Sequence, residues 1–342
     1  MEKRNAGKTL KDIAKATQLS ISTVSQILNN KPSNFSSEAT KMKVKAIAQA
    51  VGYRPNIGYK IMMGAKTKTT AILIAISAVG SDEHIQKLIL LLSEKLRIKG
   101  YSTYICTLDI NENKNISLVE DLIYRGAEHF IVIGAPFGHE KIQELFKMHA
   151  KTYIAYNSLL DRCINADVVP GVEALLRFFL SENRTNFKMI LPDPVKDKFS
   201  GDRFMALKNI FSTLGNEELL DKYIAPVENP SEITPEFEKY AFEQGYEATR
   251  NIIGKAPSVQ ALLYQNDYFA LGGVKYLIEK GYRIGKDIAI AGFNNIYAVK
   301  YNPFPISSIE HNIENISDML IQEMFNKTPF QSKEKLEVCI RK

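Results

Sequence analysis

Short polar side chains are concentrated in the segment "LSISTVSQILNN" (residues 19–30), which holds three serines, a threonine and a glutamine among β-branched residues. These residue types are mediocre helix formers, so helix packing alone does not explain their choice. In a helix, Ser22 and Gln26 lie four residues apart and project from one face. The hydroxyl and amide groups on such a face can donate and accept hydrogen bonds, as the base edges in a DNA major groove require.

The neighbouring residues predict the elements that hold this face. Residues 9–17 have apolar side chains at helical spacing, and Ser20 is suited to cap a second helix after a tight turn. In the second helix Val24, Ile27 and Leu28 share the face that packs on the first. A third helix is expected from about residue 37, with Gly52 as its stop. This order predicts a helix-turn-helix; on pattern alone, a three-helix protein-interaction module is the alternative.

The charge distribution separates these alternatives. Residues 1–66 contain 12 Lys and Arg and 3 Asp and Glu, a net charge of +9. The whole chain of 342 residues has a formal net charge of +6, so residues 67–342 carry −3. A basic stretch that also has regular apolar periodicity indicates a folded module with a polyanionic partner.

From residue 69 onward, buried-strand patterns alternate with amphipathic helical patterns. Examples are "TAILIAIS", "HFIVIG" and "DIAIAGF" for strands, and "HIQKLILLLSEKLRIKG" for a helix. Such alternation predicts parallel sheets covered on both faces, with ligand chemistry at the carboxyl ends of the strands. An enzyme and a binding protein both fit this pattern.

The basic segment resembles the DNA-binding headpiece of the lactose-repressor/galactose-repressor family of bacterial transcription regulators. The shared motifs are T-x-K-D-[IV]-A, S-x-x-T-V-S and G-Y-x-P-N, within "TLKDIAKATQLSISTVSQILNN" and "SSEATKMKVKAIAQAVGYRPN". The resemblance implies that Ile21, Ser22 and Gln26 read bases. It implies phosphate contacts for Thr9, Thr23, Ser25, Asn29 and Thr40. Position 26 is commonly Arg in the family, which suits guanine, whereas Gln prefers adenine.

The next segment, "RPNIGYKIMMGAKT", resembles the family's hinge. Hinge helices of the family fold on operator DNA, pair across a dimer and insert an apolar wedge into the minor groove. Met62 stands at the wedge position. Gly58 weakens a helix by about 1 kcal/mol relative to Ala, and Tyr59 replaces a usually small residue. A plain flexible linker is the alternative interpretation.

The remainder resembles the family's effector domain, which is related to periplasmic sugar-binding proteins. The matching segments are "DRFMALKNIFSTLG", "QGYEATRNII", "QNDYFALGGVKYLIEKGYRIGKDIAIAGFNN" and "PFPISSIEHN". The resemblance implies two Rossmann-like lobes crossed by three strands, with Arg203, Asn266 and Asp267 lining a ligand cleft. A guanidinium and a carboxylate at opposed strand ends suit sugar hydroxyls.

Three departures from the family bear on the ligand. "SAVGSDEHI" has no aromatic after the first core strand, the second acid of G-F-D-D is Asn295, and an Asp-Asn pair is replaced by Asp167-Val168. These differences leave open a different sugar, a sugar acid, or no small ligand.

The predicted organisation is a small all-α helix-turn-helix headpiece at 1–56, a hinge at 57–68 and a periplasmic-binding-protein-like α/β core at 69–342. The N-terminal lobe is expected over about 69–160 plus 295–325. The C-terminal lobe is expected over about 163–292 plus 328–342. As in the family, we expect a homodimer on pseudo-palindromic double-stranded operator DNA, with a tetramer left open.

Catalytic and metal-binding patterns are not found. "AGKTL" lacks the first glycine of a phosphate-binding loop, no G-x-S-x-G occurs, and the five histidines never fall at i, i+4. Each histidine is interpreted as a surface or supporting residue. The three cysteines are widely spaced and odd in number, which predicts buried thiols in a cytosolic protein. No apolar run is long enough to span a bilayer.

The sequence therefore predicts a cytoplasmic transcription regulator without enzymatic activity, cofactor or metal. We expect it to repress carbohydrate genes under the control of a sugar-related effector. Two alternatives stand beside this one: a sugar-binding or sugar-processing protein with an incidental headpiece, and a regulator controlled by a partner protein. The sequence does not distinguish induction from co-repression, or repression from activation.

Overall fold

The computed structural model describes residues 9–29, 36–53, 66–75, 83–192, 198–213, 223–227 and 237–341. The chain divides into two compact units, Met1–Thr67 and Lys68–Lys342. The boundary lies within one residue of the predicted end of the hinge. Each unit has an apolar core of its own among the described residues.

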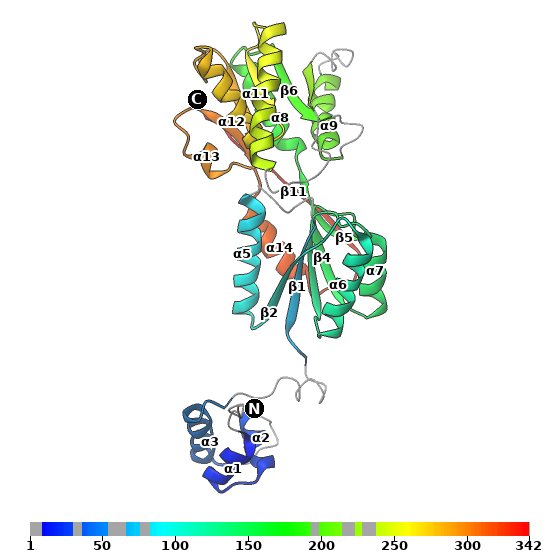
Figure 1. Ribbon diagram of the computed structural model, residues 1–342, viewed down its shortest axis with the longest axis vertical. Coiled ribbons are helices and arrows are strands. Elements are labelled where there is room, and N and C mark those ends of the chain that lie inside the picture. Colours follow the sequence, from blue (N-terminus) through cyan, green and yellow to red (C-terminus); the bar gives the residue numbers. More distant parts are fainter. Residues whose placement is uncertain are drawn as a thin grey trace, which may run out of the picture. The chain divides into compact units, whose positions relative to one another are not determined.

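The described part of the first unit is the predicted helix-turn-helix with a third helix: α1 (Leu10–Thr17), α2 (Ile21–Leu28) and α3 (Glu38–Ala50) (Figure 1). Local capping sets the helix ends. Ser20 Oγ accepts from the Thr23 amide at 3.0 Å, as predicted, and Ser37 Oγ accepts from the Thr40 amide at 3.2 Å. The turn between α1 and α2 places Gln18 in the left-handed region. Gly52, at φ +63°, follows α3.

One small apolar core unites these three helices. It is made by Ile13, Ala14, Val24, Ile27, Val44 and Ala48. Ile13, Val24 and Val44 are fully buried, one from each helix. Because the helices are short, they depend on this shared core more than on their own propensity.

The first sheet of the second unit is parallel throughout, in the order β11-β5-β4-β3-β1-β2. Its strands are β1 (Thr69–Ile74), β2 (Ser102–Thr107), β3 (His129–Ile133), β4 (Thr152–Tyr156), β5 (Arg162–Asp167) and β11 (Phe330–Lys335). Its helices are α5 (Glu83–Ile98), α6 (Glu112–Tyr124), α7 (His139–Met148) and α14 (Ile313–Glu323).

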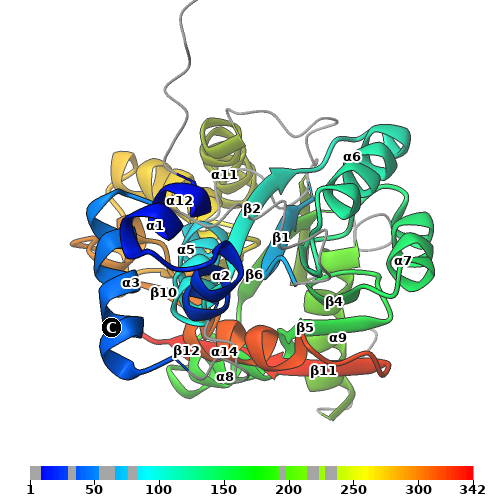
Figure 2. The same cartoon turned by 90° about the horizontal axis from the view of Figure 1, so that it is seen from below.

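Strand alternation distributes these helices over both faces of the first sheet. Ile72 and Ile74 of β1 pack with α5 and α14, whereas Ala71 and Leu73 pack with α6 and α7. Figure 2 shows α6 and α7 on one flank of these strands. Because both faces of the sheet are buried, the sequences of its strands are nearly continuous apolar runs.

The second sheet has the order β12-β10-β9-β8-β6-β7, and only the β12–β10 pairing is antiparallel among the described strands. Its strands are β6 (Phe187–Pro192), β7 (Ile224–Val227), β8 (Ala261–Tyr264), β9 (Ala289–Phe293), β10 (Ile306–Glu310) and β12 (Glu337–Cys339). Its helices are α8 (Val169–Ser181), α9 (Lys198–Thr213), α11 (Phe237–Lys255), α12 (Asp267–Glu279) and the short α13 (Tyr297–Lys300).

Each face of the second sheet is also covered. One apolar cluster joins α8 and α9 to the sheet, and another joins α11 and α12 to the opposite face. The axes of α11 and α12 approach closely at two glycines. A Cβ at Gly272 would overlap the Phe242 carbonyl oxygen, and one at Gly245 would overlap that of Phe269.

The described chain passes between the two lobes three times, as the family resemblance implied. The crossings join β5 to α8, β10 to α14, and β11 to β12. The Leu336 amide donates to the Asp167 carbonyl at 3.0 Å, which links the first and third crossings.

The predicted lobe boundaries need correction at the crossings. The segment 162–167 (β5) belongs to the first sheet rather than to the second lobe, and so does β11 at 330–335. Residues 297–310, which hold α13 and β10, belong to the second lobe. Hydrophobic alternation locates strands but carries no signal for which of two sheets they join, and this is why the boundaries were misplaced.

Candidate nucleic-acid interface and inter-lobe site

Helix α2 presents one apolar and one polar face. Val24 and Ile27 are buried in the core of the first unit. Ser22 is exposed, Ile21 keeps 44% of its surface exposed, and Gln26 is half-buried. The predicted base-reading residues therefore lie outside the apolar core, and the exposed Ile21 can contact a thymine methyl group.

The predicted phosphate-contacting residues of α2 also shape its ends. Thr23 Oγ1 lies 2.8 Å from the hydroxyl of Ser20 at the helix start. At the other end, the Asn29 side-chain amide donates to the Ser25 carbonyl oxygen at 2.8 Å and to Ser25 Oγ at 3.3 Å. These local hydrogen bonds fix the side-chain directions before any partner binds.

Thr9 and Thr40 lie at the starts of the other two helices. The Thr9 amide and hydroxyl donate to the Asp12 carboxylate at 2.7 and 2.9 Å. Thr40 Oγ1 is 2.9 Å from Ser37 Oγ in the first turn of α3. Amide groups at helix N-termini are suited to phosphate oxygens. Lys11, Lys15, Lys43 and Lys45 are exposed and add positive charge.

The hinge prediction falls outside the described residues. Met62, Gly58 and Tyr59 all lie within 54–65.

In the second unit, two histidines meet between the lobes. His84 lies in the first turn of α5, and His311 directly follows β10 at a crossing. Their rings are stacked at a centroid distance of 4.3 Å and an interplanar angle of 2°. His311 Nδ1 is 2.6 Å from the hydroxyl of Tyr156, which ends β4. The cluster thus joins a helix, a crossing and a strand end.

Arg203 of α9 reaches the same region from the second lobe. Its guanidinium carbon lies 4.3 Å from the ring centroid of Phe293, the last residue of β9. Burial, followed by the repulsion of His84 and Arg203, holds the pKa of His311 well below its usual value. His311 is therefore neutral at pH 7, and the potential at its ring is positive.

The other two predicted pocket residues are engaged within the second lobe. Asn266 caps α12 by accepting from the Phe269 amide at 3.1 Å. Asp267 is fully buried, and its carboxylate accepts from the Ile296 amide at 2.9 Å and the Ser308 hydroxyl at 2.8 Å. Asp267 therefore holds the loop after β9 against β10.

The hydrogen bonds of that loop also account for Asn295, which stands where the resemblance predicts an aspartate. Asn294 and Asn295 both have positive φ, which Asn tolerates better than most residues. The Asn295 amide donates to Glu310 at 2.7 Å, and its carbonyl accepts from Arg341 at 2.7 Å. An aspartate there could not donate to Glu310.

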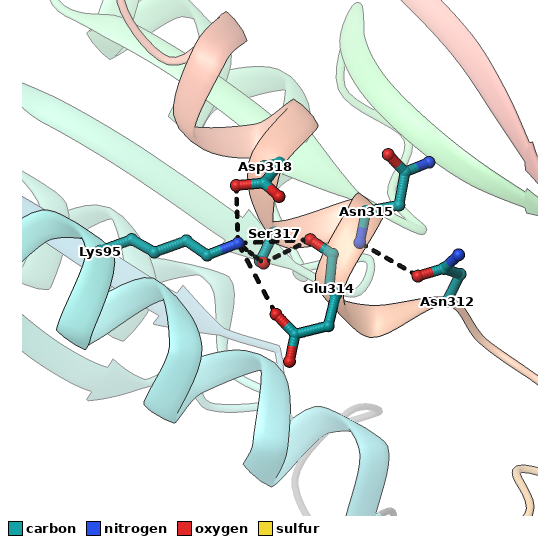
Figure 3. Close-up of polar contacts among 6 residues, drawn as sticks. All are labelled: Lys95, Asn312, Glu314, Asn315, Ser317 and Asp318. Atoms are coloured by element: carbon teal, nitrogen blue, oxygen red, sulfur yellow. Dashed lines mark hydrogen bonds and ion pairs between the residues drawn. The ribbon is translucent and has the colours of Figure 1, made fainter.

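A lysine ties α5, which holds His84, to α14, which begins two residues after His311 (Figure 3). Lys95 of α5 points to α14, where its ammonium contacts Ser317 Oγ at 2.7 Å and Asp318 at 2.6 Å. Asn312 caps α14 by accepting from the Asn315 amide at 3.1 Å. This contact holds α5 against α14.

Sequence reasoning missed the roles of His84, His311 and Tyr156. Each is unremarkable in its local segment, and only the tertiary fold unites them. The single signal was the position of Tyr156 at the carboxyl end of the predicted strand "TYIAYN".

The described residues also bear on other classes of function. Within the described ranges, no cluster of three His, Cys, Asp or Glu residues is arranged to hold a metal ion. Of the helices described, none is long and apolar enough to cross a membrane.

The two units match two family models. Residues 9–56 match the family "Bacterial regulatory proteins, lacI family", and residues 176–340 match "Periplasmic binding protein-like domain". The chain thus has the fold of a helix-turn-helix regulator with a two-lobe α/β core.

Curated relatives and solved structures align with this chain over most of its length. The HTH-type transcriptional repressor PurR of Pasteurella multocida is 22% identical over 98% of both chains. The ribose operon repressor of Escherichia coli is 21% identical over 93% of this chain and 92% of its own. A Lac repressor dimer bound to operator and the anti-inducer ONPF has a TM-score of 0.77 at 15% identity, covering 98% of both chains. In its first unit the chain is thus similar to the lacI family of bacterial regulatory proteins, and in its second to periplasmic-binding-protein-like domains.

Proposed function

We propose that this protein is a sequence-specific DNA-binding transcription repressor whose affinity for DNA is controlled by a small ligand bound between the lobes of its core. The observation that carries the proposal is the α2 face: Ile21, Ser22 and Gln26 stand outside a compact apolar core in a strongly basic unit. The match of residues 9–56 to the lacI family supports it.

In this proposal the exposed face of α2 enters the major groove. Ile21, Ser22 and Gln26 contact base edges, and the local hydrogen bonds of Thr23, Ser25 and Asn29 orient their polar groups toward phosphates. Thr9 and Thr40 anchor the starts of α1 and α3 at the backbone. Met62 wedges into the minor groove beside its twin in a homodimer, so the operator is pseudo-palindromic.

The ligand occupies the region of Arg203, His84 and His311. Arg203 makes the direct contact, while Asn266 and Asp267 support it by fixing α12 and the loop after β9. A ligand that binds one lobe arrangement better than another shifts the population toward it, and the shift is limited by that difference in affinity. The protein acts in the cytoplasm and turns nothing over: the ligand is sugar-related and leaves unchanged.

The test is a selection of duplexes from a random-sequence library by the full-length protein. We expect a pseudo-palindromic motif to be enriched, because a two-fold dimer presents two copies of α2. A Gln49→Asp variant serves as control, since Gln49 is exposed on α3. It should select the same motif with lower overall affinity. If no motif is enriched over several rounds, the proposal is wrong.

A further inference from the structure

The strands of the first sheet begin along one edge, because the sheet is parallel. Backbone hydrogen bonds join the segments that lead into them. The Ser102 amide donates to the Lys68 carbonyl at 2.8 Å, and the Glu128 amide donates to the Thr69 carbonyl at 2.9 Å. We call this edge the strand-start rim, and it comprises Lys68 and the segments 98–101, 124–128, 148–151 and 325–329.

A packed aromatic cluster holds the rim together. The ring centroid of His129 lies 5.4 Å from that of Tyr101 and 5.0 Å from that of Phe325. The centroids of Tyr101 and Phe325 are 5.7 Å apart. Nδ1 of His129 also hydrogen-bonds with the Thr152 hydroxyl. The connections into β2, β3, β4 and β11 are thereby brought to one surface.

The rim is the basic part of an acidic unit. It contains five Lys or Arg and one Glu, a net charge of +4. Residues 67–342 as a whole carry −3, so the rest of them carry −7. Lys68, Lys99 and Lys327 are exposed and Lys151 is half-buried, and none of the four forms an ion pair with another described residue. His149 is exposed in the same segment as Lys151.

The neighbouring carboxylates are largely covered. Glu128 and Glu323 keep only 19% and 17% of their side-chain surface exposed. Glu323 accepts from the Asn326 amide at 2.9 Å and lies 3.4 Å from the guanidinium of Arg162. Glu128 lies 3.9 Å from Nε2 of His129. The charge that the rim presents to its surroundings is therefore positive.

A structural role explains part of this charge. Lys99, Lys151 and Lys327 come within four residues after the ends of α5, α7 and α14, where a positive charge complements the helix dipole. That role does not apply to Lys68, which directly precedes β1 and adds a fourth ammonium group to the same edge. Together the four lysines form a surface that is complementary to a polyanion.

The rim also lies where the chain enters the second unit, since Lys68 begins that unit. Residues 53 and 66 are 13 residues apart, a stretch of at most about 47 Å. A duplex bound by the first unit is thus tethered to the second unit at high effective concentration.

We propose that the strand-start rim of the first lobe is a second DNA-binding surface, which contacts the phosphate backbone of the duplex beside the half-site that α2 reads. The inference rests on the proposed DNA-binding function and adds a contact made by the core. Ammonium groups bind phosphates as point charges and carry no sequence information. The rim therefore adds affinity only when the duplex extends beyond the motif.

The experiment measures the affinity of the full-length protein for its selected motif in two duplexes by fluorescence anisotropy. The short duplex ends at the motif, and the long duplex has about 15 further base pairs, roughly one and a half turns, on each side. We expect the long duplex to bind at least tenfold more tightly at 50 mM salt. The slope of log affinity against log salt should steepen by about 0.9 for every added phosphate contact. Equal affinities for the two duplexes overturn the inference.

Two triple variants with the same loss of charge assign the effect to the rim. The rim variant carries Lys99→Gln, Lys151→Gln and Lys327→Gln. The control variant carries Lys208→Gln, Lys255→Gln and Lys286→Gln, at three exposed lysines of the second lobe.

The rim variant should lose at least tenfold in affinity for the long duplex and keep its affinity for the short duplex within twofold, which also shows that it is folded. The control variant should keep the preference for the long duplex. Arginine at the three rim positions should keep it too, because the charge is retained. Equal behaviour of the rim and control variants, or an equal loss on both duplexes, overturns the inference.

Vesicles of equal parts phosphatidylglycerol and phosphatidylcholine test the other large polyanion. Vesicle binding that depends on the rim lysines, with no preference for the long duplex, would assign the rim to a membrane surface and overturn the inference. Failure here differs from failure of the proposed function. A failed selection yields no motif, whereas a failed rim comparison leaves a motif that binds equally in both duplexes.

Discussion

The polar face of α2 and the histidine cluster between the lobes are built in opposite ways. The polar side chains of α2 lie in one eight-residue helix or directly after it, and the side-chain hydrogen bonds of Thr23, Ser25 and Asn29 span three or four residues. In the cluster, His84, Tyr156, Arg203, Phe293 and His311 come from different elements and contact one another over 90 residues or more.

This contrast has a physical consequence. A substitution on the exposed face of α2 changes which partner is contacted and leaves the helix intact, because the apolar face does the packing. A substitution in the cluster changes contacts that involve residues of both lobes. DNA preference should therefore be altered without loss of stability, whereas the ligand response should be coupled to core stability.

The largest effect is expected from a charge placed under α2. Val24 is fully buried, so Val24→Asp puts an uncompensated carboxylate into a small core at a cost of several kcal/mol. The first unit should unfold, and affinity for the selected duplex should fall more than about 100-fold, since about 2.7 kcal/mol corresponds to that factor. Fluorescence anisotropy measures the loss, and calorimetry should show the core transition unchanged.

Gln49→Asp is the control for that experiment. It adds the same charge at an exposed site of α3, so it should lower affinity without unfolding the helices. Near-normal DNA binding by Val24→Asp would show that the first unit is not the DNA-binding element.

In the core, a single methyl group should have the next largest effect. Gly272→Ala places a Cβ against the Phe242 carbonyl, and overpacking of this kind costs about 1–3 kcal/mol, occasionally more. Denaturant unfolding should show the core destabilised by about 3 kcal/mol, the upper end of that range.

Gly254→Ala, near the end of α11, is the matched control. A Cβ there meets no atom within 4 Å, so the substitution should stabilise the helix by up to about 1 kcal/mol. Equal effects of the two substitutions would disprove the close approach of α11 and α12.

A substitution that changes which bases are recognised should have a smaller effect on free energy than the two changes above. Gln26→Arg should shift preference toward guanine at one position of each half-site, by about 1–3 kcal/mol for a good bidentate pair. The measurement is a repeated duplex selection. Gln49→Arg adds the same charge elsewhere and should raise affinity for all duplexes alike. An unchanged motif with Gln26→Arg would mean that residue 26 does not read bases.

The smallest expected effect is a pH dependence of core stability. The folded pKa of His311 lies below the unfolded value of about 6.5. The unfolded chain therefore takes up the proton first as pH falls. The contribution of His311 to stability is present above pH 6.5 and is lost as pH falls toward the folded pKa.

The free energy of unfolding of the core should accordingly decline between pH 7 and pH 5, and His311→Gln should flatten part of that decline. His149→Gln should keep the wild-type slope. Identical slopes in all three proteins would contradict the burial of His311 against His84 and Arg203.

The same contrast explains what the sequence could predict. The helix-turn-helix follows from capping at Ser20 and Ser37 and from apolar spacing within about 40 contiguous residues, and the structure confirms these helices. The alternating strands and the three crossings were also predicted correctly. The lobe membership of β5, β10 and β11 was not, because strand patterns do not specify a sheet.

The inter-lobe site shows a different limit. Arg203 was predicted from a family motif. Its proximity to His311 could not be predicted, because it depends on the tertiary fold that brings residues 203 and 311 together. Asp267 was expected to contact the ligand, and the structure shows its carboxylate engaged by Ile296 and Ser308. No pattern in "SSIEHN" signals that His311 would stack on His84, since the pairing depends on how α5 and α14 pack.

The most direct test of the central claim is the ratio of dissociation constants of the full-length protein for its selected duplex and for a shuffled duplex of equal composition, measured at 50 and 200 mM salt. Both affinities should weaken with salt through counterion release, by about 10³–10⁵ if six to ten phosphates are contacted. The selected duplex should remain favoured at both concentrations, because base contacts by α2 release few counterions. Equal dissociation constants for the two duplexes at both salt concentrations would contradict sequence-specific recognition by this chain.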